Sequence, residues 1–314
     1  MNSVVYVPFV ASALIACLCR VASSRRWPLA AAYTITAAAV IGAVSTVGAL
    51  VLLASPLPAR VPWIASLGRW QPGAVVAHSP VAAWTSALAM AALVVLAHRT
   101  LLEVRALVQD AIDASRLAAT ICGSQRDADA DADAVVVVGD EVPHAHAVGF
   151  GIRDRGRVIV SSAMLLLLDH EERAAMIAHE RAHLRERHAV LLAVVRVATA
   201  MNPLLHGLRA DVRFALERSA DEAAARATDR PVVASAVARA ALAVIDVGRH
   251  APHALAFHPH GVADRVSALL AEPDRRRRPS WPLVAVLVIA ALAFAWATHD
   301  TERFFEAVRR LSHR

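Results

Sequence analysis

Apolar residues gather in four long runs along the chain, and polar segments separate them. The runs cover residues 4–19, 28–54, 80–97 and 281–298. Crossing a hydrocarbon core of roughly 30 Å takes about 20 apolar residues in a helix, and each run comes near that length. We therefore predict four transmembrane helices. Trp281 and Trp296 lie near the two ends of the fourth helix, where membrane proteins often carry interfacial tryptophans.

The first run could instead be a secretory signal peptide. A signal peptide carries its basic residues before the apolar run. Here Arg20, Arg25 and Arg26 follow the run. We therefore expect the first run to remain in the protein as a membrane helix, with Arg20 extending from its end toward the lipid headgroups.

A fifth apolar segment, residues 188–205, allows two interpretations. It reads HAVLLAVVRVATAMNPLL, which is barely long enough to span a bilayer and has Arg196 in its middle. An arginine at the bilayer centre costs on the order of 3 kcal/mol on insertion scales. We therefore favour a buried helix of a soluble domain over a fifth transmembrane span.

The pattern between the third and fourth runs is that of a soluble domain. Residues 100–121 predict an amphipathic stalk helix, with apolar residues at helical spacing at Leu101, Val104, Leu107, Val108 and Ile112. Val135–Val138 predicts a short buried strand, and residues 144–160 predict two strands around a polar turn. The alternating aspartates of residues 127–133 lack the glycine and glutamate of a calcium loop, so we expect a solvated linker there.

Composition and charge agree with a membrane protein. The chain is 57% hydrophobic, with a mean hydropathy of +0.47, which is high for a soluble domain. Its net charge of +6 could indicate nucleic-acid binding, but Arg275–Arg278 directly precede the fourth run, where basic residues anchor a membrane helix. We therefore expect no direct nucleic-acid partner. The three cysteines form no CxxC pair, which favours a reducing compartment for the soluble domain.

Arginine placement predicts the orientation, because cytoplasmic loops are enriched in basic residues. The arginines between runs one and two, after run three and before run four all fall on one side of a four-helix topology, which we take as cytoplasmic. Arginines after the fourth run oppose this orientation, but earlier charges usually dominate. The expected parts are a membrane domain (1–98), a cytoplasmic domain (99–280), and a segment (281–314) with the fourth helix and a short external tail.

The candidate chemistry lies in MIAHERAHLRERH, residues 176–188. Residues four apart share one face of a helix, so His179 and His183 point the same way, and Glu180 flanks them. Two neutral imidazoles suit Zn²⁺, and a nearby carboxylate can take the proton of a metal-activated water. The motif therefore predicts His179 and His183 as metal ligands and Glu180 as general base. The competing interpretation is a polar helix face with solvated histidines.

A third ligand is expected from FALERSADEAAARA, residues 214–227. Glu217 can complete a His/His/Glu set, and Asp221 can accept a hydrogen bond from the free nitrogen of a ligand histidine. Alone, these acids would equally suit a surface helix. A single site needs Glu217 and His183 on one side of the membrane, which again argues against a fifth span.

Three segments resemble membrane gluzincin metallopeptidases: HERAH (179–183), ERSAD (217–221) and AVGFGIRDRGRVIVSSAMLLLL (147–168). The insertion between the third and fourth spans resembles the beta-lactam sensor–transducer (BlaR/MecR) type, and more distantly the chain resembles the HtpX and CAAX-prenyl-protease type. The resemblance implies a mainly α integral membrane protein. A zinc-peptidase α+β domain would lie between helices three and four, and substrate would add as a strand beside a small edge sheet.

The chain departs from the sensor type in several places. Residues 299–314 leave no room for the S-x-x-K motif of a penicillin-binding domain, so we expect no beta-lactam sensing by its own acylation. His188 stands where sensors often have aspartate and where HtpX-type proteins often have histidine. AFHPHGVADRVSALL (256–270) resembles the His-Pro…Arg segment of the HtpX type with one extra residue. That resemblance implies His258 as an oxyanion stabiliser and Arg265 as structural, with His253, His260 and an ordinary loop as alternatives.

The resemblance implies a zinc-dependent endopeptidase in the plasma membrane with its active site facing the cytoplasm. Its expected partners are membrane lipid and a protein or peptide substrate, such as a DNA-binding repressor of the BlaI type cleaved in an antibiotic response. An HtpX-like quality-control protease and a catalytically inactive membrane signalling protein are the alternatives. The oligomeric state is left open.

Overall fold

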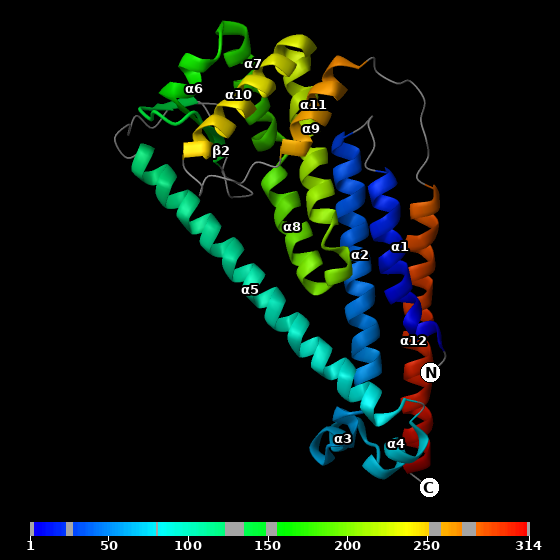
Figure 1. Cartoon of the computed structure of the whole chain (residues 1–314). Coiled ribbons are helices and arrows are strands. Elements are labelled where there is room, and N and C mark those ends of the chain that lie inside the picture. Colours follow the sequence, from blue (N-terminus) through cyan, green and yellow to red (C-terminus); the bar gives the residue numbers. More distant parts are fainter. Residues whose placement is uncertain are drawn as a thin grey trace.

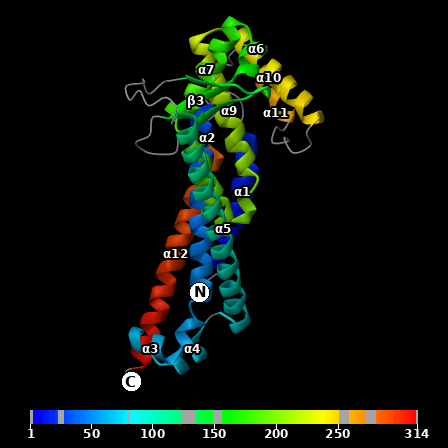
Figure 2. The ribbon, with the colours of Figure 1, turned by 90° about the vertical axis from the view of Figure 1, so that its left-hand side faces the viewer.

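A computed structural model describes residues 3–22, 28–79, 81–122, 135–148, 156–250, 259–271 and 281–312. Within these residues the chain is mostly helical and has a single three-stranded sheet. Long helices form a bundle, and shorter helices and the sheet form a head at one end of it (Figure 1). The view turned by 90° shows the bundle as a narrow column beneath the head (Figure 2).

The bundle helices coincide with the four apolar runs. They are α1 (Val7–Ala22), α2 (Pro28–Ala54), α5 (Ala83–Cys122) and α12 (Trp281–Ser312). A short 3-10 helix, η1 (Ser3–Tyr6), precedes α1, and α2 packs against the other three helices. Helix α12 continues well past the predicted end of the fourth span, so the expected external tail is helical as far as Ser312.

Two helical segments within the described residues are long and apolar enough to span a bilayer. They are Pro28–Arg60 and Ala83–Arg116. Val7–Cys19 and His188–Met201 are shorter apolar helices. The four-helix crossing of the membrane therefore stays a prediction.

Helix α5 unites the predicted third span and the predicted stalk in one continuous helix. It diverges from α2 along its length and leaves a wedge between them (Figure 1). Helix α8 (His188–Met201) lies in this wedge, in contact with both α2 and α5. A turn through η3 (Pro203–Leu205) then leads into α9 (Leu208–Ala227), which returns to the head.

Helices α8 and α9 form a hairpin, so the chain returns to the head after residues 188–205 and does not continue to the opposite end of the bundle. Leu191, Val195, Leu205 and Leu208 are buried in one core with residues of α1 and α2. Leu205 Cδ1 lies only 3.1 Å from where a side chain at Gly42 would begin, so a larger residue at this position would have to displace the Leu205 side chain. The expected buried helix is present, but it packs on α2 and α5 of the bundle as well as on α9.

Acidic residues of α5 compensate the arginine inside this hairpin. Arg196 Nε donates to Glu103, and its Nη1 donates to Asp110 Oδ2 at 2.9 Å. Arg209 Nη2 of α9 donates to the second oxygen of Glu103 at 3.2 Å. The charge of Arg196 is therefore paired with two carboxylates, which offsets part of the cost of placing it between apolar helices.

The sheet has the order β1-β3-β2, with β1 (Val135–Val138) parallel and β2 (Ala145–Val148) antiparallel to the central β3 (Arg157–Ser161). All three predicted strands are present. Val158 and Val160 pack with Met164 and Met176 beneath the sheet. Strand β2 forms an edge of the sheet and lies against helix α7 (His170–Arg185), which carries the histidine motif.

The remaining helices complete the two ends of the molecule. In the head, α6 (Ser162–Leu167) leads into α7, and α10 (Arg230–His250) and α11 (Pro259–Leu270) pack on α7 and α9. At the opposite end lie η2 (Pro58–Arg60), α3 (Pro62–Gly68) and α4 (Pro72–His78). Trp70 from this part packs on Phe305 of α12, with ring centroids 5.1 Å apart.

Candidate metal centre

Helix α7 presents His179 and His183 toward α9. The helix starts at a capping box, in which the Asp169 side chain accepts the Glu172 N–H and the Glu172 side chain accepts the Asp169 N–H. This firm start fixes the register of the motif. One turn apart, the two rings bring their Nε2 atoms to 3.1 Å from each other.

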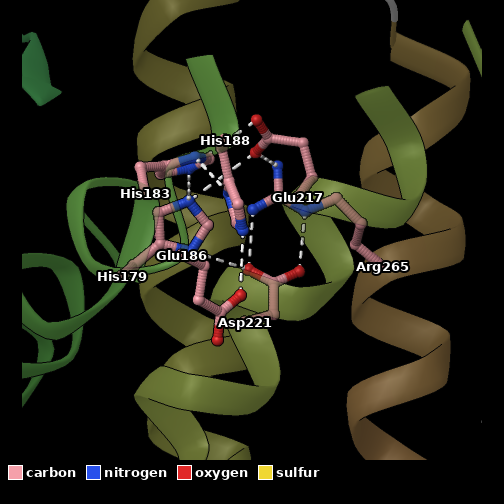
Figure 3. Close-up of polar contacts among 7 residues, drawn as sticks. All are labelled: His179, His183, Glu186, His188, Glu217, Asp221 and Arg265. Carbon is pink, nitrogen blue, oxygen red and sulfur yellow. Dashed lines mark hydrogen bonds and ion pairs between the residues drawn. The ribbon is translucent and has the colours of Figure 1, made fainter. Parts of the chain in front are cut away.

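Helix α9 brings Glu217 to the same point. Its Oε2 lies 3.6 Å from His179 Nε2, and its Oε1 lies 3.8 Å from His183 Nε2. One ligand atom from each of the three residues falls within 4.8 Å of the others (Figure 3). The structure thus brings together the three predicted ligands, because the α8–α9 hairpin returns the chain to the motif.

The donor set fits Zn²⁺. Two ring nitrogens bound to a tetrahedral zinc at about 2.0–2.1 Å lie about 3.3 Å apart, close to the 3.1 Å between the Nε2 atoms here. His183 Nδ1 has a hydrogen-bond partner in His188, and His179 Nδ1 lies 3.0 Å from the Asp221 carboxylate, which leaves both Nε2 atoms to face one position. Two imidazoles and one carboxylate leave a coordination position for water, as in catalytic zinc sites.

Protonation of the two rings differs. Burial lowers the pKa of His179, but hydrogen bonds to Asp221 and Glu217 outweigh burial and raise it to about 10. Burial lowers the pKa of His183 to about 3, and the neighbouring His179 adds to this. A metal ion would therefore displace a proton from His179 and meet an already neutral ring at His183.

Glu180 lies beside the ligand cluster, as the motif predicts. The backbone N–H of Ala147, in the edge strand β2, donates to its carboxylate. Burial raises the pKa of Glu180 to about 7, although His179 and this N–H act in the opposite direction. A carboxylate with a pKa near neutrality can accept a proton in one step and return it in another.

Asp221 supports His179, and Arg265 supports Asp221. Asp221 Oδ1 lies 3.0 Å from His179 Nδ1. From α11, Arg265 Nε donates to Asp221 Oδ2 at 2.8 Å and its Nη2 donates to Oδ1 at 2.7 Å. Arg265 Nη1 also lies 3.0 Å from Glu217 Oε2. Arg265, taken from the sequence as structural, thus contacts both carboxylates that surround His179 (Figure 3).

A second set of contacts reaches His183. His188 Nδ1 lies 2.8 Å from His183 Nδ1, and His188 Nε2 lies 2.9 Å from Glu186 Oε2. Ser219 Oγ donates to the same Glu186 oxygen at 2.6 Å. Neither Glu186 nor Ser219 was predicted at the centre from the sequence. The available signals were their positions, three residues after His183 and two after Glu217.

The predicted oxyanion residue His258 falls outside the described residues, as does its competitor His253. Its role therefore stays a prediction. Arg265, from the same sequence segment, lies at the metal centre.

Residues 103–215 match the family model described as Peptidase family M48. The match starts in α5 and ends in α9, so it includes His179, Glu180 and His183. Glu217 and Asp221 lie just beyond it and join the site by geometry. No curated protein and no solved structure gives a significant match.

Proposed function

We propose that the protein is a zinc-dependent membrane endopeptidase. The match of residues 103–215 to the Peptidase family M48 model supports metallopeptidase activity. The observation that carries this proposal is the convergence of His179, His183 and Glu217, with one ligand atom of each within 4.8 Å of the others. A zinc ion, when bound, would polarise the scissile carbonyl and lower the pKa of a bound water.

Glu180 is the residue to which we assign proton transfer. Its half-buried carboxylate flanks the ligand cluster, and its pKa of about 7 lets it take a proton from the attacking water. The same carboxyl group can then donate that proton to the leaving amine nitrogen. Asp221 holds His179 through Nδ1, so that Nε2 stays directed at the metal position.

The edge strand β2 supports action on polypeptides. Among the strands of the described residues, β2 pairs with β3 on one side and with none on the other. Ala147 in β2 contacts Glu180, so the strand lies next to the proposed base. An extended peptide paired with the free edge of β2 would pass beside Glu180.

For the membrane topology we propose four spanning helices, α1, α2, α5 and α12, with the head in the cytoplasm. Two of the helical segments, Pro28–Arg60 and Ala83–Arg116, have the required length and composition. The arginine distribution supports the orientation. The head, with the metal centre, lies at the end of the bundle where α2 starts (Figure 1).

The substrate we propose is a cytosolic DNA-binding repressor of the BlaI type. Its support is the position of the peptidase between the third and fourth spans, as in sensor–transducer peptidases. HtpX-like quality control is the second candidate, supported by His188 and by the segment that contains Arg265.

Comparing new protein N-termini between cells that make the wild type and cells that make Glu180→Gln tests this proposal, with and without cell-wall stress. Cleavage of a single repressor that requires the wild-type protein would support regulation, and cleavage of many membrane proteins would support quality control. Unchanged N-termini in both conditions, together with purified wild type that binds no stoichiometric zinc, would refute the proposed protease.

A further inference from the structure

We propose that His188, Glu186 and Ser219 form a positioning relay that fixes the ring of His183 with Nε2 facing the metal position. The inference rests on the proposed zinc site and adds three residues to it. None of the three contacts the metal position directly, so they are positioning residues and not ligands.

The hydrogen-bond roles in the relay follow from one assignment. If His183 gives the Nε2 lone pair to a metal, its proton is on Nδ1. That N–H then donates to His188 Nδ1 at 2.8 Å, which requires His188 to carry its own proton on Nε2. His188 Nε2–H donates to Glu186 Oε2 at 2.9 Å, and the Ser219 hydroxyl donates to the same oxygen at 2.6 Å. Every donor in the chain has an acceptor.

Burial makes this arrangement selective. The His188 ring is only 1% exposed, so water cannot replace either of its partners at low cost. The opposite His183 tautomer would place a proton on Nε2, directed at His179. His188 would then have to donate from Nδ1 and accept at Nε2, and Glu186 would have to be protonated in order to donate to it. The relay therefore favours the tautomer that can bind a metal.

The path of the chain explains why these three residues meet. Glu186 caps the C-terminal end of α7, and Arg187 adopts a left-handed conformation with φ of 53°, which turns the chain into α8. This turn places His188 at the start of α8, directly behind His183. Ser219 reaches Glu186 from α9, two residues after Glu217. The relay thus connects the end of α7, the start of α8 and the middle of α9 through hydrogen bonds.

The experiment measures the affinity of the full-length protein in detergent for Zn²⁺, by competition with a chromophoric chelator. We expect His188→Leu to weaken Zn²⁺ binding about 10- to 100-fold, the usual effect of losing a partner of a ligand histidine. His188→Asn, whose side-chain oxygen can take the place of Nδ1 as acceptor, should recover most of the affinity. His170→Leu, at an exposed histidine that starts α7 as His188 starts α8, is the matched control.

Absorption spectra of the Co²⁺-substituted proteins give a second readout, because a rotated His183 changes the ligand field. If His188→Leu fails to fold, Glu186→Ala tests the outer part of the relay, with exposed Glu171→Ala as its control. Zn²⁺ affinities of the relay variants equal to those of their controls would overturn the relay. Equal losses in His188→Leu and His188→Asn would also overturn it, because that result indicates a packing defect. A wild type without stoichiometric Zn²⁺ would instead refute the proposed function.

Discussion

Each of the three predicted metal ligands has a neighbouring side chain that holds it in place. His179 has Asp221, His183 has His188, and Glu217 has Arg265. The two histidines and the two acids could be predicted as one site by combining the HExxH motif with the four-residue spacing of Glu217 and Asp221, because four residues correspond to about one helical turn. Arg265 and Glu186 could not be predicted in these roles, because their contacts depend on how distant helices meet.

Glu180→Gln should keep the protein folded and able to bind zinc, but should reduce peptide hydrolysis by about 10²–10⁴-fold. The amide has the shape of the carboxylate but cannot accept the proton of the attacking water. Cleavage of a quenched peptide and zinc content should be measured on the same samples. Glu171→Gln, on the exposed first turn of α7, is the control and should behave as the wild type. Hydrolysis retained in Glu180→Gln would remove Glu180 from the mechanism.

Arg265→Leu should destabilise the protein by about 3–5 kcal/mol, because it leaves the carboxylate of Asp221 buried without its cation. The Tm of the full-length protein measures this. Arg310→Leu, at a surface arginine that is 82% exposed and paired with Glu306, should shift the Tm little. In the double variant Asp221→Asn with Arg265→Leu, the loss should be smaller than the sum of the single losses. Additive losses would show that the pair is not coupled.

At the element scale, the seam between α5 and α8 is organised around Arg196. The apolar pattern of residues 188–205 predicted a buried helix, and the structure shows one. The pattern could not say which surface buries it, because one apolar helix face fits a soluble core and a membrane bundle equally well. The extension of α12 to Ser312 was missed for a related reason. Phe304, Phe305 and Val308 find their apolar partners in η2, Trp70 and α4, which are distant in the sequence.

Glu103→Ala should destabilise the protein more than Asp110→Ala does, although both acids belong to α5 and bind Arg196. Glu103 is 18% exposed and pairs with both Arg196 and Arg209, whereas Asp110 is 56% exposed and pairs with Arg196. We expect about 3 kcal/mol for Glu103 and at most about 1 kcal/mol for Asp110. The Tm values of the two variants provide the comparison, and equal shifts would contradict a buried seam.

For the whole molecule, the α8–α9 hairpin, which carries the third predicted ligand, shares one hydrophobic core with α1 and α2 of the bundle. Leu191, Val195, Leu208 and Val212 belong to one buried cluster with Ile15 and the alanines of α2. At the tip of the hairpin, the buried Asn202 Nδ2 donates to Ser12 Oγ at 2.9 Å and to Thr46 Oγ1 at 3.0 Å. The division at residue 98 stays a prediction, and this core crosses it.

A fragment of residues 99–280 should therefore aggregate and bind no zinc, because the apolar sides of α8 and α9 lose their partners. Supplying residues 1–98 on a separate chain in the same cells should restore zinc binding. Gel filtration in detergent and zinc content measure both effects. A soluble, monomeric fragment that binds zinc would show that the head folds independently of the bundle.

The shared core also has a consequence for biosynthesis. The first residues of α9 pack on α2, and Glu217 lies midway along the same helix, so we expect the third ligand to reach the histidines only after α1 and α2 are in place. A newly made chain that fails to insert would hold HExxH without its carboxylate partner. Under the proposed function, a mislocalised copy would be a protease without a metal site. Errors of membrane targeting would then release no active enzyme among the soluble proteins of the cell.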